Sequence, residues 1–301
     1  MSAHQAPGLP GNWLNGWLAA VGITVLLDNV HLSWTDDVVP IAVFHGEDDL
    51  AGALAAVLPS DTDLGRLAIA RHHPNTPVEL PRDVTFDAFA ARARLARSSH
   101  DLTLEATLTD LARKEPSKNR RKDEGEDLVA HGPLDPDTPR GRTLHERLMA
   151  VRSAITDPAV TIERSLAGHG VRIKGNGLGF DHRRFAAGVQ PDAEVAVDPV
   201  IELLCFFSLL LLPVRGAGAH TRRYVRQRGW DGSRLRRHAL TWPIWAMPLD
   251  RWGIDALLDI VWTSSLQTAR RWGVSGLYGS VAQQPKSSSD VSRSYASERL
   301  W

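Results

Sequence analysis

The chain has 301 residues, of which 43% are hydrophobic and 23% charged, and its 35 basic and 35 acidic residues cancel to a net charge of zero. These proportions are those of a globular protein and exclude a wholly disordered chain, a collagen or a coiled-coil rod. No apolar run reaches the ~20 residues of a membrane helix. The first residues show no secretory leader, and the single Cys205 excludes an intramolecular disulfide and a cysteine-based zinc cluster. We therefore expect a cytoplasmic protein that does not associate with membranes.

Charge and tryptophan are unevenly distributed along the chain. Residues 1–110 hold six basic and fourteen acidic residues, a net charge of −8, whereas residues 164–237 hold thirteen basic and six acidic residues, a net charge of +7. Six of the ten tryptophans lie between Trp230 and Trp272. Such asymmetry is typical of a protein with one face for a polyanion and another for a different partner, although two solvated faces would give the same pattern.

The first third of the chain predicts alternating helices and short strands. After a small-residue tail that ends at Pro10, apolar residues at helical spacing predict a helix over 13–27, with Asn12 as its N-cap. Two strands over 30–34 and 38–44 flank a turn at Asp36-Asp37, and a helix over 47–58 stops before Pro59. Residues 113–142 contain four prolines, charges of both signs and three large aliphatic residues, which predicts a linker or mobile loop.

The second half predicts one strongly buried helix among weaker elements. A helix over 143–156 is followed by strands over 160–166 and 171–174. Asp198-Pro199 is a helix-start signal, and the apolar helix that follows runs to Leu211 before Pro213. Strands are expected within 220–245 and a helix over 250–264, in which Trp252 and Trp262 are expected to be core residues.

Together these elements predict an α+β fold, with several amphipathic helices around short antiparallel strands and a buried central helix near 199–212. We divide the chain into an acidic α+β region over 1–112, a charged Pro-rich linker or mobile loop over 113–142, a basic, Trp-rich α+β region over 143–282 and a loose, Ser-rich tail over 283–301.

Motifs for catalysis and cofactor binding are weak in this sequence. The Gly-rich stretch 175–179 lacks the Gly-Lys-Ser/Thr ending of a phosphate loop and is expected to be a turn. No HExxH, CxxC or Gly-x-Ser-x-Gly motif is present, and Cys205 within an apolar helix is expected to be inert packing. We therefore predict no enzyme activity, no cofactor and no metal. The weakest alternative is a metal-dependent nuclease that uses His169, Asp181 and His182.

A basic–aromatic stretch gives the clearest functional signal. Residues 215–237 carry eight arginines against the single Asp231. Arginine forks suit phosphate oxygens, and aromatic faces stack on unpaired bases. The alternative is an exposed arginine-rich loop beside a Trp-rich core that includes Trp242 and Trp245. The predicted phosphate contacts, with Trp230 as the stacking residue, are Arg183, Arg184, Arg222, Arg223, Arg226, Arg228, Arg234, Arg236 and Arg237.

Three landmarks in a fixed order carry a resemblance to a known family. They are residues 10–23 (PGNWLNGWLAAVGI), residues 180–184 (FDHRR), and residues 197–204 (VDPVIELL) with the later segment 242–249. In this order they resemble the small accessory or large-subunit-like proteins of type I-G (formerly type I-U) CRISPR systems. The resemblance implies a place in an RNA-guided complex that targets DNA.

In such complexes guide-RNA pairing reads the sequence, while protein subunits hold the nucleic-acid backbone, the flanking motif or the displaced strand. The resemblance therefore implies a non-catalytic subunit that contacts guide RNA or target DNA, with other effector subunits and the helicase–nuclease as partners. A protein–protein adaptor that links the complex to its helicase–nuclease, with the arginine cluster docking an acidic partner, is the alternative.

Overall fold

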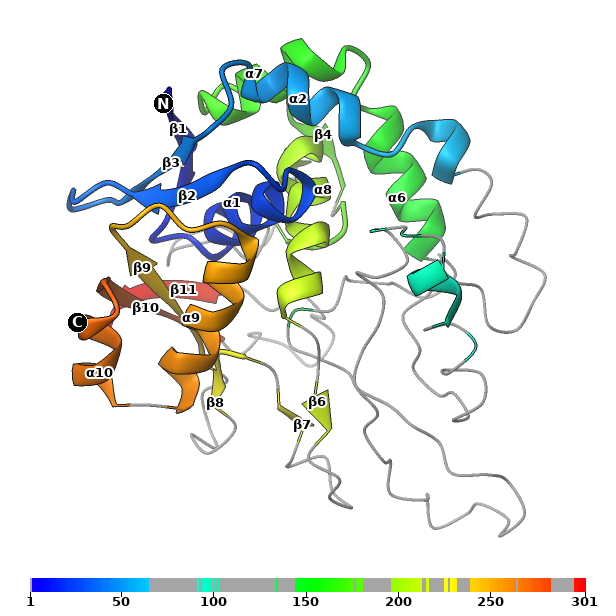
Figure 1. Cartoon of the computed structure of the whole chain (residues 1–301). Coiled ribbons are helices and arrows are strands. Elements are labelled where there is room, and N and C mark those ends of the chain that lie inside the picture. Colours follow the sequence, from blue (N-terminus) through cyan, green and yellow to red (C-terminus); the bar gives the residue numbers. More distant parts are fainter. Residues whose placement is uncertain are drawn as a thin grey trace, which may run out of the picture.

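The computed structural model describes residues 2–64, 91, 94–98, 100, 102, 134, 144–175, 177–180, 196–212, 215–216, 225–226, 228–231, 239–263, 265–282 and 295–301. These residues form the predicted α+β fold, in which helices surround antiparallel strands (Figure 1). The predicted linker over 113–142 lies outside the described residues except for Leu134, whose side chain is buried.

The N-terminal sheet has the strand order β1–β3–β2, and both of its pairs are antiparallel. Strands β2 (His31–Trp34) and β3 (Ile41–His45) form the predicted hairpin. Strand β1 (Ala3–Pro10) corrects the expectation of an N-terminal tail, because its residues pair with β3 from Ala3 to Pro10 through one irregularity. Short, small side chains gave this strand little β-forming signal, and pairing with β3 supplies the stabilisation instead.

Helix α1 (Leu14–Leu26) confirms the predicted first helix, and every one of its residues is buried. Its N-cap is Trp13 and not Asn12, and no side chain caps this end. The amide of Trp13 instead donates to the carbonyl of Pro10 at 3.1 Å, so the end of β1 turns directly into the helix. A helix that is buried all round must lie between other elements of the core.

The predicted central helix is confirmed as α8 (Pro199–Ser208), which continues into the 3₁₀ turn η3 (Leu209–Leu211). Asp198 caps α8 as predicted, because its carboxylate accepts from the amides of Val200 at 2.9 Å and Ile201 at 3.3 Å. Proline at the first helical position costs no hydrogen bond, since that amide has no partner within the helix.

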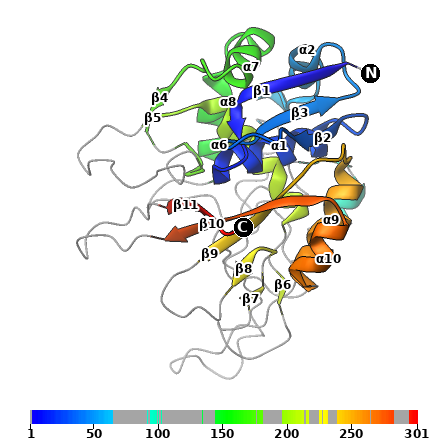
Figure 2. The ribbon, with the colours of Figure 1, turned by 90° about the vertical axis from the view of Figure 1, so that its left-hand side faces the viewer.

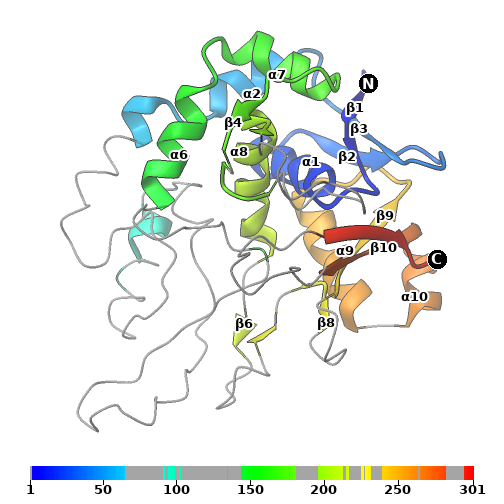
Figure 3. The same ribbon diagram turned by 180° about the vertical axis from the view of Figure 1, so that it is seen from behind.

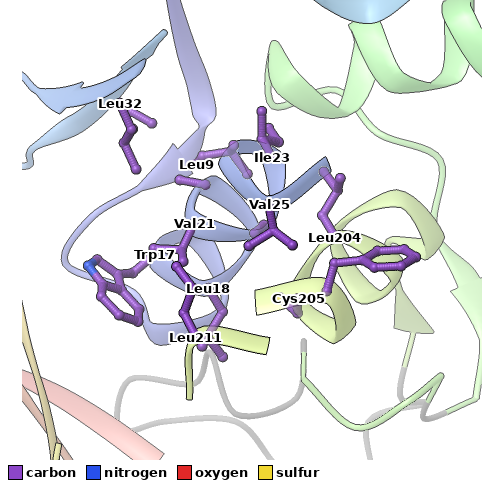
Figure 4. Close-up of a cluster of buried hydrophobic side chains, with 14 of the residues drawn as sticks. Leu9, Trp17, Leu18, Val21, Ile23, Val25, Leu32, Leu204, Cys205 and Leu211 are labelled. Atoms are coloured by element: carbon purple, nitrogen blue, oxygen red, sulfur yellow. The ribbon is translucent and has the colours of Figure 1, made fainter. Parts of the chain in front are cut away.

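Helices α1 and α8 pack against each other at very short range (Figure 4). A Cβ at Gly22 would lie 1.9 Å from the carbonyl oxygen of Leu204, so only glycine permits this approach. The thiol of Cys205 donates to the carbonyl of Asn15 at 3.2 Å and is fully buried, which agrees with inert packing. The core of the protein is centred on this helix pair.

Three further helices lie on the side of α8 away from α9, where two of them pack on α8 and the third, α2, packs on α7 (Figure 3). They are α2 (Leu50–Val57), α6 (Leu144–Ser153) and α7 (Pro158–Leu166). Helices α2 and α6 confirm predicted helices, but α7 replaces the strand predicted over 160–166. Its buried residues are Thr161, Ile162, Ser165 and Leu166, which follow the helical period, and Pro158 begins it. The short strands β4 (Ile173–Lys174) and β5 (Ala196–Val197) pair beside it.

The C-terminal sheet has the order β11–β10–β9–β8, again antiparallel throughout its described pairs (Figure 2). Its strands are β8 (Trp230–Asp231), β9 (Ala239–Trp245), β10 (Val274–Ala282) and β11 (Tyr295–Arg299). Helices α9 (Arg251–Thr263), as predicted, and α10 (Leu266–Arg271) connect β9 to β10. Strand β11 corrects the expectation of a loose tail, because it pairs with β10 over five positions.

Indole groups join the two sheets. The indole nitrogens of Trp242, Trp245 and Trp17 donate to the carbonyls of Gly11 at 2.7 Å, Leu32 at 2.8 Å and Pro243 at 2.9 Å. Leu32 of β2 also exchanges two backbone hydrogen bonds with Leu249, which lies between β9 and α9. The predicted packing role of the segment that contains Trp242 and Trp245 is confirmed. The described residues of the acidic and the basic regions therefore share one hydrophobic core.

Candidate nucleic-acid interface

The arginine-rich stretch over residues 215–237 begins where η3 ends. Strand β6 (Arg215–Gly216) follows η3 and pairs with β7 (Val225–Arg226), and β8 comes next along the chain. Figure 1 shows β6, β7 and β8 together, beyond the C-terminal end of α8. The described parts of the arginine-rich stretch therefore gather on one side of the molecule, as a shared binding surface requires.

The register of the β6–β7 pair sets two arginine positions opposite each other. Arg215 lies opposite Arg226, and Gly216 lies opposite Val225. Like charges at directly opposite positions of an antiparallel pair destabilise it. The backbone therefore brings two arginines of the basic stretch into register although ten residues separate them in the sequence.

Most of the predicted contact residues lie outside the described part of the chain. These are Arg183, Arg184, Arg222, Arg223, Arg234, Arg236 and Arg237. Arg226 is in β7, and Trp230 is in β8, where it is the register partner of Leu240. Strand β8 attaches this region to the C-terminal sheet, and Gly229 adopts φ +86°, a conformation that favours glycine, just before it.

Arg228 is a correction to the predicted phosphate track. Its side chain is only 5% exposed, and its Nε donates to Asp259 at 2.9 Å while its Nη1 contacts Asp255. Nη1 also donates to the carbonyl of Leu211 at 2.9 Å. Arg228 therefore ties the end of η3 to α9 and is not available to a phosphate. The spacing of the two aspartates at i and i+4 places them on one face of α9, but it does not identify Arg228 as their partner.

The Gly-rich stretch forms the predicted turn, and a buried carboxylate accepts hydrogen bonds from its backbone amides. Gly175, Gly177 and Gly179 all have positive φ. Glu202 of α8 is fully buried, and its carboxylate accepts from the amides of Leu178 at 2.5 Å and Phe180 at 3.2 Å. The turn is thus fixed directly onto the first turn of α8.

Arg147 of α6 fixes the same turn from its other side, because its Nη1 donates to the carbonyl of Gly177 at 2.6 Å. Glu202 and Arg147 therefore position the chain immediately before residues 181–184. The second landmark of the CRISPR resemblance thus begins against the third, which includes Glu202. The first landmark packs on the same helix through Gly22.

Two tryptophans that sequence reasoning did not place on the surface are exposed. Trp252 was expected in the core but is 63% exposed, and the guanidinium of Arg251 lies 4.2 Å from the centre of its ring. Arg251 also pairs with Asp28 at 3.2 Å. Trp272, at the end of α10, is 56% exposed, whereas Trp262 packs partly buried against the core as predicted. Position 252 faces outward because Ile254, Leu257 and Leu258 turn the opposite side of α9 inward.

A polar cluster lies on the N-terminal sheet. The hydroxyl of Ser33 and Nε2 of His45 are hydrogen-bonded at 2.9 Å, and His31 is the register partner of His45. Burial, and then repulsion by His31, lowers the pKa of His45 below its ordinary value. These causes favour a neutral imidazole at neutral pH, which suits its hydrogen bond with the buried hydroxyl.

Among the described residues, no three His, Cys, Asp or Glu side chains gather as metal ligands would. His169 is exposed after α7, while Asp181 and His182 of the alternative metal trio lie outside those residues. In the same described part of the chain, no helix combines the length and apolarity needed to cross a bilayer. Comparisons with protein-family models and with curated proteins find no match to this chain.

Proposed function

We propose that this chain is a non-catalytic subunit of a type I-G-like CRISPR effector complex and contacts nucleic acid through the arginines that follow α8. Its ligands are the guide RNA or the target DNA, in the cytoplasm, and its other partners are effector subunits and the helicase–nuclease. The observation that carries the proposal is the β6–β7 register, which sets Arg215 opposite Arg226. Two cations brought together in this way form a phosphate-binding unit when an anion bridges them.

The fold supports a role for the arginine stretch as an attached surface element. Arg228 and strand β8 anchor it to α9 and to the C-terminal sheet. At the other end of α8, Glu202 and Arg147 anchor the turn that leads to Arg183 and Arg184. The two basic segments therefore leave the core at opposite ends of the same helix, and we propose that each contacts its own part of a bound strand.

Fluorescence anisotropy with labelled single-stranded RNA and DNA tests the proposal. The test variant is Arg215→Gln with Arg226→Gln, and the matched control is Arg94→Gln with Arg97→Gln, two exposed arginines elsewhere. The logarithm of affinity falls with the logarithm of salt by about 0.7 for each phosphate contact on a single strand. We expect the test variant to bind more weakly and to flatten this slope by about 1.4, whereas the control keeps the wild-type slope.

Equal losses for the two double variants would show a general effect of net charge and would contradict the proposed site. A wild-type chain that binds neither nucleic acid at low salt would contradict the proposed function. The adaptor alternative predicts that result, together with loss of a protein partner in pull-downs with the Arg215/Arg226 variant.

A further inference from the structure

A second basic–aromatic surface lies at the end of α10 and beside β11, on the C-terminal sheet. We call it the α10–β11 surface, and its residues are Met247, Arg270, Arg271, Trp272, Arg299 and Trp301. None of them belongs to the arginine stretch that follows α8. Figure 2 shows the C-terminus beside β10, the strand that follows α10.

Contacts among its own residues hold this surface together. The guanidinium of Arg270 lies 4.7 Å from the centre of the Trp301 ring, and Nε of Arg299 donates to the carbonyl oxygen of Trp301 at 3.1 Å. Trp272 ends α10, where its amide bonds to the carbonyl of Ala269 at 3.0 Å. The first two contacts limit the freedom of the Arg270, Trp301 and Arg299 side chains, and the third fixes the backbone at Trp272, so that binding a ligand orders fewer groups.

Trp272 is placed to receive a flat ligand. Trp272 is 56% exposed and caps the C-terminal end of α10. Met247, itself 52% exposed, lies against Gly273, the residue that follows Trp272. A Cβ at Gly273 would be 3.3 Å from the methyl carbon of Met247. An exposed indole keeps apolar area in contact with water, and tryptophan is enriched at binding surfaces because its ring offers both a large apolar face and a polar edge.

The charge around Trp272 favours an anionic ligand. The described residues over 265–282 and 295–301 include three arginines, at positions 270, 271 and 299, and one acidic residue, Glu298. A protein partner with an acidic surface would satisfy this charge alone. A nucleic-acid strand satisfies both the charge and the exposed indole, because phosphates and flat bases alternate along it.

We propose that the α10–β11 surface is a stacking platform for single-stranded nucleic acid, with Trp272 stacking on a base and Arg270 and Arg271 contacting the adjacent phosphates. Arg270 is held in place by Trp301. Because a base inside a duplex has both faces covered, this platform distinguishes single strands from duplexes. The inference rests on the proposed nucleic-acid function and adds a second contact region to it.

Trp252 provides a matched control within the same chain. It is as exposed as Trp272 and also sits beside an arginine. However, Arg251 already lies over its ring and is paired with Asp28. One face of this indole and its neighbouring charge are therefore already engaged, and Trp252 should contribute little to binding a strand.

The experiment compares full-length wild type with Trp272→Ala, Trp272→Phe and Trp252→Ala. The probes are a fluorescein-labelled oligothymidylate of about 20 nucleotides and a duplex of equal length. Loss of a stacked base corresponds to an affinity weaker by roughly 5- to 140-fold. We expect Trp272→Ala to show this loss on the single strand, Trp272→Phe to recover part of it, and Trp252→Ala and all duplex affinities to stay within about twofold of wild type. Circular dichroism checks that each variant is folded.

Three results would overturn the platform alone. They are an unchanged single-strand affinity of Trp272→Ala, an equal loss for Trp252→Ala, or an equal loss on the duplex. In each case wild type still binds and the Arg215/Arg226 variant still weakens binding, so the proposed function stands. If wild type binds no single strand at all, both proposals fail together.

Discussion

Arg228 permits a sharp test of how the arginine stretch is attached to the core. Its side chain is 5% exposed, whereas the side chains of Asp255 and Asp259 are 39% and 54% exposed. Removing the cation leaves two carboxylates that water can reach. Neutralising the carboxylates instead leaves a guanidinium in the interior without its counter-charges, which is the costlier state.

The expected losses of unfolding free energy follow from the exposed fractions of these three side chains. Arg228→Met removes hydrogen bonds to two carboxylates and to the carbonyl of Leu211. Because the carboxylates are more than one-third exposed, we discount their contribution and expect a loss of about 2–3 kcal/mol in the free energy of unfolding. Asp255→Asn with Asp259→Asn should lose about 3–5 kcal/mol, since the buried charge remains.

Urea unfolding monitored by tryptophan fluorescence and circular dichroism measures both values. Arg271→Met serves as the control, because Arg271 is exposed, and it should change the free energy of unfolding by less than about 0.5 kcal/mol. The reasoning fails if Arg228→Met is more destabilising than the double aspartate variant. It also fails if Arg228→Met is as mild as the control, since Arg228 would then not be an anchor.

Three further substitutions test the core and the polar clusters. Gly22→Ala should destabilise the protein by more than about 3 kcal/mol in thermal unfolding, because its Cβ would meet the backbone of α8, whereas Gly276→Ala, with its nearest neighbour at 3.7 Å, should be close to neutral. Glu202→Gln should cost about 1–3 kcal/mol by urea unfolding, because it weakens two buried hydrogen bonds to the Gly-rich turn. Burial and His31 lower the pKa of His45, so the folded state binds its proton less readily than the unfolded chain does. The stability that depends on a neutral His45 is present above about pH 6.5 and is lost as pH falls towards the folded pKa. His45→Gln should therefore flatten the dependence of unfolding free energy on pH between pH 7 and 5, and an unchanged slope would contradict this prediction.

The helices that could be predicted from sequence are those with a local start or stop signal. Asp198 and Pro199 specify the start of α8, and the long apolar run specifies its burial. Helix α7 has the same kind of start signal in Asp157 and Pro158, but Val160 and its neighbours alternate in hydropathy as a strand would, so the two local signals disagree. The burial of Ile162 against other helices decided its structure, and that burial is a tertiary effect.

The candidate interface was predictable as a region but not residue by residue. The sequence places Arg226 and Arg228 two positions apart with the same side-chain chemistry. The structure buries Arg228 between two aspartates of a helix that begins more than twenty residues later, and no local pattern encodes that distance. The exposure of Trp252 was missed for a related reason. Tryptophan is usually buried, and only the packing of α9 shows which side of the helix faces outward.

The burial of Arg228 also changes what the arginine stretch can contribute to binding. Counted from the sequence alone, all eight arginines of residues 215–237 could contribute to one surface. The structure buries one of them, Arg228, in an ion pair that anchors the stretch to the core. Because each phosphate contact contributes about 0.7 to the salt slope on a single strand, losing Arg228 should leave the slope unchanged as long as the protein stays folded. Losing Arg215 and Arg226 should flatten the slope while stability is retained. Anchor and contact arginines are therefore separable by two measurements, unfolding free energy and salt slope, and each class should move one of them and not the other.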